Sequence, residues 1–507
     1  MKIENINNKN SINFKSSMGG LSNALYTLSN NDMLNASFVD IFAMDTPRTI
    51  IETKHRGKQA GIEMGFREYT GTFIAEFSAA VFAILASKFI SKELKPDVKV
   101  NSGSWITNNG LNVFSEIYEK SDKTPKGYVE NVLNSMSGIV GNKTREFSAI
   151  NKEKTKSVVE KLTNLVTDRT LDKKASKKTL TSIQDEIIKL LGADNNITIK
   201  GVKNSLSANL THTLRDIVDS GKNIFFNETK QSSNHILSKL KTINNLRIAI
   251  TIPLSMGLAI TNQYLNRYLT KKRTGIDNFV GENGYENHVK DKNEKKKEKG
   301  LWIKKLLSAV IFVLMLTKVM GVKKPMDLIK KLEFDGPATS GNAIKTIYGT
   351  LILGRIFAAK DSTELRETNV RDYLGFLNWL VLGGFVAKGV GQALDLKQTN
   401  LFNITKEGKG IIHWLKDVSL KSQKEIIAQG GNVKANLRKL NIAQISGIAY
   451  SAIMLGVLLP KLNICMTRKK GDYNRVTKQP QKYTNMNFKS AFVSMEKFTK
   501  KNKIADK

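Results

Sequence analysis

Residues 67–90 read REYTGTFIAEFSAAVFAILASKFI, and residues 371–391 read RDYLGFLNWLVLGGFVAKGVG. In both, an arginine, an acid, a tyrosine and a glycine come before an apolar stretch. A helix rises about 1.5 Å per residue, so about 18 to 20 apolar residues reach across the ~30 Å hydrocarbon core of a bilayer. The two stretches therefore suggest one membrane-spanning unit that occurs twice in the chain.

Further apolar stretches support the membrane interpretation. A short one at 346–359 contains Arg355, and lysines or a glutamate interrupt or flank several others. The alternative is a soluble protein with long core helices. So many near-spanning segments in one chain nevertheless favour a membrane protein. The five stretches of full length are 72–90, 246–265, 301–320, 374–391 and 442–460.

Four short matches recur in the same order and predict an internal duplication. Each alone would be weak evidence, but together they define one copy at 35–275 and a second at 342–471. The matched pairs are Asn35-Ala36 with Arg48 and Asn342-Ala343 with Arg355; REYTG and RDYLG; ITNNG (106–110) and ITKEG (404–408); LNRYLTKKR (265–273) and LNICMTRKK (462–470).

Small residues recur every fourth position on one stripe of each aligned helix. Ala79, Ala83 and Ser87 in the first copy match Gly383, Ala387 and Gly391 in the second. Small residues at this spacing let helix backbones approach closely in lipid. The two stripes are therefore predicted to lie in helix–helix contacts.

The rest of the chain is polar and basic. Its formal charge is +35, from 80 Lys and Arg against 45 Asp and Glu, and it contains only 8 prolines. With few alternating stretches, this composition favours helix. Amphipathic helices are expected at 150–167, 179–191 and 205–218 within a soluble helical insert, 91–245. The remaining predicted segments are a disordered N-terminus (1–34), a charged linker (276–300), a connecting membrane helix and loop (301–341) and a basic tail (472–507).

The basic clusters that end each copy predict the topology. Lys and Arg near helix ends mark the cytoplasmic side. If 346–359 crosses the bilayer there are six spans, both termini are cytoplasmic in the inner cell membrane, and the copies are parallel. If it does not cross, there are five spans and the copies are inverted. The residues expected to contact anionic lipid headgroups are Lys271, Lys272, Arg273, Arg468, Lys469 and Lys470.

The repeated Arg–acid–Tyr motif is the strongest candidate site. An Arg–carboxylate pair at the mouth of a helix bundle could bind an anionic or zwitterionic ligand, or latch a gate. The favoured alternative is a membrane anchor, with Arg at the headgroups, the acid at a helix N-terminus and Tyr at the interface. Glu76 and Lys388 lie deeper. The candidate positions are Arg67, Glu68, Tyr69, Arg371, Asp372, Tyr373 and Lys388.

Sequence motifs for catalysis are missing. The chain has no GxxxxGK[ST] loop, no HExxH and no paired CxxC, its five histidines are scattered, and Cys465 is its single cysteine. We therefore expect no enzyme activity, no cofactor, and no catalytic or metal site.

These observations predict an all-α, multi-pass helical membrane protein with an internal duplication and a soluble helical insert. The expected function is a membrane scaffold or assembly factor that holds protein partners through insert 91–245. A transporter or channel with parallel repeats is the first alternative. The second is a soluble or peripheral basic helical protein that binds anionic lipid or nucleic acid. Nucleic acid is disfavoured because the basic residues are spread along the whole chain.

Overall fold

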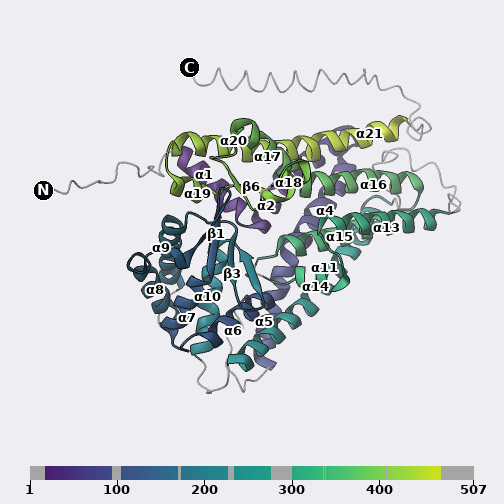
Figure 1. Cartoon of the computed structure of the whole chain (residues 1–507). Coiled ribbons are helices and arrows are strands. Elements are labelled where there is room, and N and C mark those ends of the chain that lie inside the picture. Colours follow the sequence, from purple (N-terminus) through teal and green to yellow (C-terminus); the bar gives the residue numbers. More distant parts are fainter. Residues whose placement is uncertain are drawn as a thin grey trace.

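The computed structural model describes residues 17–93, 104–168, 173–226, 233–275, 300–334, 336, 338–406 and 408–469. The chain is mostly helical, with a few short strands (Figure 1). Nearly all of the predicted linker 276–300 and the whole predicted tail 472–507 lie outside the described residues. The predicted disorder of residues 1–34 is wrong from Ser17 onward. Residues Ser17–Ser29 form helix α1, which buries Leu25.

Four long helices dominate the fold, and three of them contain a π-helical turn. Arg67 and Arg371 each lie nine residues inside such a helix, so the expectation that their motifs precede the helices is wrong. The four helices are α4 (Lys58–Phe73) with η2 (Ile74–Ser78) and α5 (Ala79–Glu93); α11 (Ser233–Thr274); α16 (Ser362–Leu377) with η4 (Asn378–Leu382) and α17 (Gly383–Leu394); and α20 (Val433–Ser451) with η5 (Ala452–Leu458) and α21 (Leu459–Lys469).

Among the described residues, three helices are long and apolar enough to cross a membrane, judged by length and composition alone. They are Lys58–Ile90, His235–Thr274 and Val433–Thr467. Helix α13 (Leu301–Val319) covers all but the last residue of the predicted stretch 301–320 but is not among them, and its 19 residues include Lys304, Lys305 and Lys318. The fold is thus compatible with membrane association.

A shorter helical segment precedes each motif-bearing helix. Before α4 the chain forms α2 (Asp32–Phe38), η1 (Val39–Asp45) and α3 (Thr46–Arg56), and before α16 it forms α15 (Gly341–Ala358). Gly57, with φ of 95°, makes the turn between α3 and α4. The Asp361 side chain accepts hydrogen bonds from the first turn of α16. Each short segment can therefore fold back on the long helix that follows it. Helix α14 (Pro325–Lys331) connects α13 to α15.

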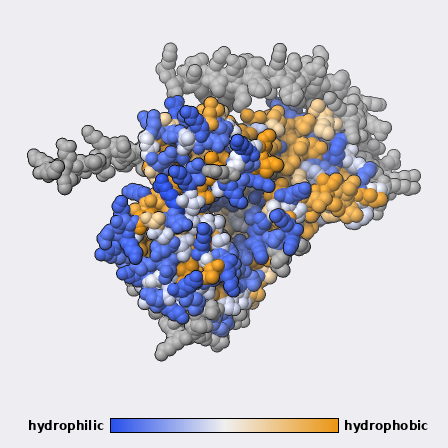
Figure 2. All heavy atoms as spheres, viewed as in Figure 1, coloured by the Kyte–Doolittle hydropathy of each residue, from blue (hydrophilic) through white to orange (hydrophobic). Residues whose placement is uncertain are grey.

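Apolar side chains cover the outside of this helical part. On α13, Trp302 is 65% exposed and Ile303 70%. Figure 2 shows hydrophobic surface gathered over the region of α13 and α16, whereas the part at the lower left, within residues 104–226, is largely hydrophilic. Exposed apolar surface of this kind marks sites of contact with other proteins or with membranes.

The small-residue stripes lie in helix–helix contacts, as the spacing predicts. Ala79 and Ala83 are fully buried, and α5 packs against α11. On the second predicted stripe, a Cβ added to Gly447 of α20 would lie 2.7 Å from the Gly383 carbonyl oxygen and 3.0 Å from the Ala387 Cβ. Helices α17 and α20 therefore pack at backbone distance.

We expect Ala83→Leu to destabilise the protein by about 1–3 kcal/mol, because the larger side chain has no space between α5 and α11. Val81→Leu is the matched control, since Val81 is 45% exposed on the same helix. Thermal unfolding of the detergent-solubilised protein measures both. Equal midpoints for the two variants would place the stripe on an open face and contradict the packing argument.

The first insert combines helices with a small antiparallel sheet, so its predicted all-helical nature is wrong. The segment 205–208 is a strand, and Asn209 caps the helix that follows. The strands β1 (Met136–Val140), β2 (Lys143–Glu146), β3 (Ile197–Lys200) and β4 (Ser205–Ala208) are ordered β2-β1-β3-β4. The helices are α6 (Asn108–Lys120), α7 (Pro125–Asn134), η3 (Phe147–Ala149), α8 (Lys152–Thr167), α9 (Lys173–Leu191) and α10 (Leu210–Phe225). Their apolar faces form one core.

A second, smaller insert (395–432) joins α17 to α20. It contains β5 (Phe402–Ile404), α18 (Ile411–Asp417), β6 (Val418–Leu420) and α19 (Gln423–Gln429). The Glu425 carboxylate accepts backbone hydrogen bonds at 2.9 Å from Asp194 and Asn195 of the first insert. Tyr26 of α1 donates to Asp194. Burial, together with the charge of Asp194, raises the pKa of Tyr26 far above its usual range and keeps the phenol protonated. Direct hydrogen bonds therefore fix the inserts and α1 to one another.

Candidate functional site

Six charged side chains meet in the centre of the helical part. Two come from α4, two from α16, and one each from α3 and α15. All six are at most 4% exposed. We call them the central network; they are Arg48, Arg67, Glu68, Arg355, Arg371 and Asp372.

We call residues 35–275 the first copy and residues 342–471 the second copy, after the predicted duplication, and Arg355 connects these two segments. Its Nη2 lies 3.3 Å from Glu68 Oε2 of the first copy, and its Nη1 lies 3.1 Å from Asp372 Oδ1 of the second. Arg371 Nε lies 2.7 Å from the same Asp372 oxygen. One guanidinium thus bridges two carboxylates on different helices, with the geometric specificity that a planar guanidinium allows.

Glu68 is the most heavily contacted carboxylate of the central network. Besides Arg355, Arg67 Nε lies 3.3 Å away and Arg48 Nη1 3.6 Å away. Three guanidinium groups therefore surround one buried carboxylate. Such an arrangement is sensitive to the loss of any one charge, because water cannot replace it.

The glycines of the two motifs contact the central network reciprocally. A Cβ at Gly71 would lie 3.3 Å from Nη2 of Arg355, and a Cβ at Gly375 would lie 3.4 Å from Nη2 of Arg48. The glycine of each copy therefore lies against the arginine of the other copy.

Backbone contacts follow the same reciprocal pattern. A Cβ on Gly354 of α15 would lie 2.7 Å from the Ile260 carbonyl oxygen of α11. A Cβ on Gly456 of η5 would lie 2.3 Å from the Ala43 carbonyl oxygen of η1. The first segment of each copy thus packs on the last long helix of the other.

Three buried acids lie beside the central network. Asp40 and Asp45 come from η1 and Glu76 from η2, and each is 0% exposed. Thr72 donates to Asp45 at 2.7 Å. The carboxyl groups of Asp40 and Glu76 lie close together, and the Ser37 side chain lies close to Glu76. We call these three residues the acidic trio.

A second ion cluster joins the copies near the ends of α3 and α21. Arg56 Nη2 lies 2.5 Å from Glu367 Oε1, and Arg56 also pairs with Glu52 at 3.4 Å. Thr467 donates to Glu367. Both copies therefore contribute to this cluster as well.

Four of the seven sequence-selected positions meet in the central network: Arg67, Glu68, Arg371 and Asp372. Their burial does not fit the favoured anchor interpretation, which needs arginines at a headgroup-facing helix end. The two tyrosines lie elsewhere. Tyr69 is 40% exposed and pairs with Thr46, and Tyr373 donates to the Ser308 carbonyl oxygen.

Lys388 lies away from the central network. It donates to the carbonyl oxygens of Trp414 and Leu415 and lies 4.5 Å from the Trp414 ring centroid. It therefore holds α18 against α17, and it is satisfied without reaching the other candidate positions.

Arg48 and Arg355 were not among the candidate site residues. Their identical spacing from Asn35-Ala36 and Asn342-Ala343 was the signal in the sequence that could have identified them. Asp40 and Asp45 were not among the candidate site residues either. Among the described residues, no group of three or more His, Cys, Asp and Glu is arranged to hold a metal ion.

No family model matches the chain, and comparisons with curated proteins and with solved structures give no match either. The assignment of a function therefore rests on the geometry described above.

Proposed function

We propose that the chain is an integral, multi-pass membrane scaffold that holds its two inserts as one rigid platform on one side of the bilayer. The observation that carries this proposal is the distribution of charge. The central network is buried among helices whose outer faces expose large apolar side chains such as Trp302 and Ile303. Lipid favours this arrangement, because charged groups in a membrane protein face the bundle interior and pair with one another.

Two features support the proposed duplication. The turns η2 and η4 each begin seven residues after the arginine of their motif, and π-helical turns are rare. The reciprocal contacts of Gly71 with Arg355 and of Gly375 with Arg48 are those of two related halves that face each other.

The order of helices supports parallel copies. From α4 to its counterpart α16 the chain runs through α4–α5, α11, α13 and α15, an even number of long helical segments. If each crosses the bilayer, α4 and α16 start on the same side. Both inserts then lie on one side, and both basic ends of α11 and α21 lie on the other, which we propose is cytoplasmic.

The scaffold role is supported by the contacts that hold the helical part together and those that hold the two inserts together. Arg355 and Arg56 join the two copies inside the helical part. Glu425 accepts hydrogen bonds from the first insert, and Lys424 lies 2.9 Å from Asp185. Because contacts fix both the helical part and the inserts, the protein keeps its surfaces in one constant arrangement. A platform for partner proteins requires such an arrangement.

The acidic trio favours a transporter as the second candidate. Buried carboxylates can take up a proton, and intramembrane acids often mark ion pathways. Such a role requires water to reach the trio from one side of the membrane at a time.

Two measurements test these proposals. Alkaline carbonate extraction should leave the protein in the membrane pellet, and release into the supernatant would contradict membrane integration.

The second measurement uses the variant Thr72→Cys, next to Asp45, in a Cys465→Ser background. The scaffold predicts no labelling by an impermeant thiol reagent from either side of sealed membranes, while Ser176→Cys in the first insert labels from one side. Labelling of Thr72→Cys would favour the transporter.

A further inference from the structure

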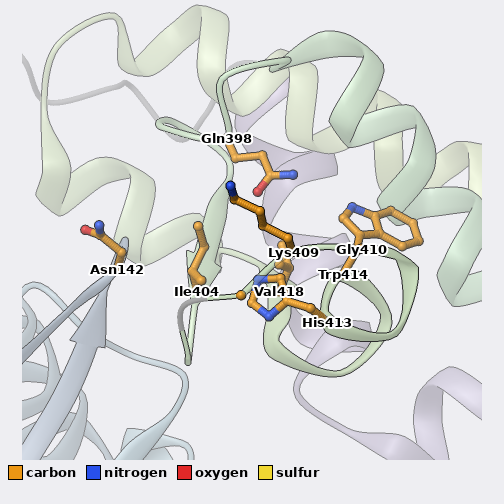
Figure 3. Close-up of a pocket in the computed structure, with 9 residues that line it drawn as sticks. Asn142, Gln398, Ile404, Lys409, Gly410, His413, Trp414 and Val418 are labelled. Carbon is orange, nitrogen blue, oxygen red and sulfur yellow. The ribbon is translucent and has the colours of Figure 1, made fainter.

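A cavity of about 340 Å³ opens between the two inserts, away from the central network. It is formed where Asn142, in the turn between β1 and β2, faces β5 and α18 (Figure 3). Ile404 and Val418 give it apolar walls. Its polar side chains are Asn142, Gln398, Lys409 and His413, and Gly408 and Gly410 contribute backbone.

The polar side of this cavity suits an anionic group. Figure 3 shows Lys409 extending toward Gln398, with the His413 ring beside the lysine stem. His413 Nδ1 lies 3.3 Å from Asp417 Oδ2, which orients the ring. The backbone at Gly408 runs against this ring, since a Cβ there would lie 2.7 Å from its Nδ1. A lysine, an imidazole and an amide around one space are typical ligands of a phosphate group.

The position of α18 places the cavity at the edge of the proposed membrane region. Lys388, which donates to Trp414 and Leu415 of α18, belongs to the apolar stretch 374–391. It lies six residues before the end of α17 at Leu394, a rise of about 9 Å. Helix α18 therefore lies beside the last turns of an apolar helix.

Apolar side chains next to the cavity point away from the protein. Leu396 is 79% exposed, Ile411 77% and Ile412 69%. Exposed side chains of this kind, on a short basic segment at the edge of a membrane region, are expected to insert among acyl chains.

We propose that this cavity binds the headgroup of an anionic phospholipid from the leaflet on the insert side. Lys409, His413 and Gln398 contact the phosphate, and the acyl chains lie against Ile411 and Ile412. This inference rests on the proposed membrane integration. The proposed lipid site lies on the opposite side of the bilayer from the basic ends of α11 and α21.

The test uses the full-length protein in detergent with two fluorescent probes that have identical chains, phosphatidylglycerol and phosphatidylcholine. Phosphatidylglycerol should bind at least about tenfold more tightly. Lys409→Gln should remove most of this difference, since hydrogen bonds to a charged group are typically worth about a factor of ten or more. Lys416→Gln is the matched control, because Lys416 is exposed on α18, which begins two residues after Lys409, and does not line the cavity.

Two further variants and a competitor complete the test. Ile411→Ser and Ile412→Ser should weaken both probes equally, because they remove contact with the chains alone. Glycerol phosphate should compete poorly. If Lys409→Gln and Lys416→Gln behave alike, or if glycerol phosphate displaces the lipid at matched concentration, the lipid site is overturned.

Binding is measured in detergent. A failure of lipid binding is therefore distinct from a failure of the protein to stay in the membrane during carbonate extraction. Gel filtration checks that each variant is folded.

Discussion

Replacing Gly354 or Gly456 with alanine is expected to lower the stability of the protein by about 3 kcal/mol or more, at the upper end of overpacking costs. A Cβ at Gly354 would lie 2.7 Å from the Ile260 carbonyl oxygen and 3.0 Å from its Cα. At Gly456 it would lie 2.3 Å from the Ala43 carbonyl oxygen. These neighbours are backbone atoms, so no side-chain rotation can relieve the contact and whole helices must separate. Gly354 also precedes Arg355, whose position would shift with it.

Gly257→Ala and Gly384→Ala are the matched controls for this prediction. Both glycines lie in helices, and an added Cβ would meet nothing within 4 Å. There the methyl group should stabilise the helix by about 0.5–1 kcal/mol. Thermal unfolding in detergent, followed by size-exclusion chromatography, gives the order of the four variants. A Gly354→Ala protein as stable as the Gly384→Ala protein would show that α15 and α11 do not touch at backbone distance.

Glu68→Gln is expected to be the most damaging single change in the central network, costing about 3–5 kcal/mol. The substitution keeps the shape of the side chain and removes its charge, so three guanidinium groups lose the carboxylate they share. Asp372→Asn should cost less, because Asp372 pairs with two guanidinium groups, those of Arg355 and Arg371, whereas Glu68 pairs with three. Glu160→Gln, on the exposed face of α8, should be neutral.

A double variant separates charge from packing in this prediction. Adding Arg355→Met to Glu68→Gln removes one of the stranded cations, so the two changes together should cost less than the sum of their separate costs. Chemical unfolding of the purified protein gives the free energies. Simple additivity, or an unfolding free energy for Glu68→Gln within about 0.5 kcal/mol of Glu160→Gln, would show that the charges are not coupled in the folded protein.

The sequence predicted the parts of this site that repeat. REYTG and RDYLG recur with an arginine upstream at fixed spacing, and the structure brings Arg48, Arg67, Arg355 and Arg371 together. The sequence could not show how deeply these arginines are buried in the helical part. Residues 58–66, KQAGIEMGF, lack a strong apolar pattern, so the start of α4 at Lys58 was hidden and Arg67 was placed at a helix end.

Partners from distant segments were also hidden from the sequence. Asp40 and Asp45 make residues 39–52 look too polar to span a membrane. The contact between Asp45 and Thr72 of α4, 27 residues further along the chain, appears only in the folded protein. The strands of the first insert were missed for a local reason. Strand β2, KTRE, is exposed along its whole length and so shows no alternation of apolar and polar residues.

The two matching π-helical turns also carry information about ancestry. A π-helical turn bonds residue i to residue i+5 instead of i+4, so it accommodates one residue more than an α-helical turn and can arise from a single inserted residue. On the proposed duplication, η2 and η4 record one insertion that preceded the copying of the gene segment. The turns η1 and η5 fall in segments whose counterparts, α15 and α11, are uninterrupted α-helices. They are therefore later events, acquired by one copy after the two had begun to diverge. A single-copy ancestor-like protein with an unbroken α-helix at the position of η2 would reverse this order.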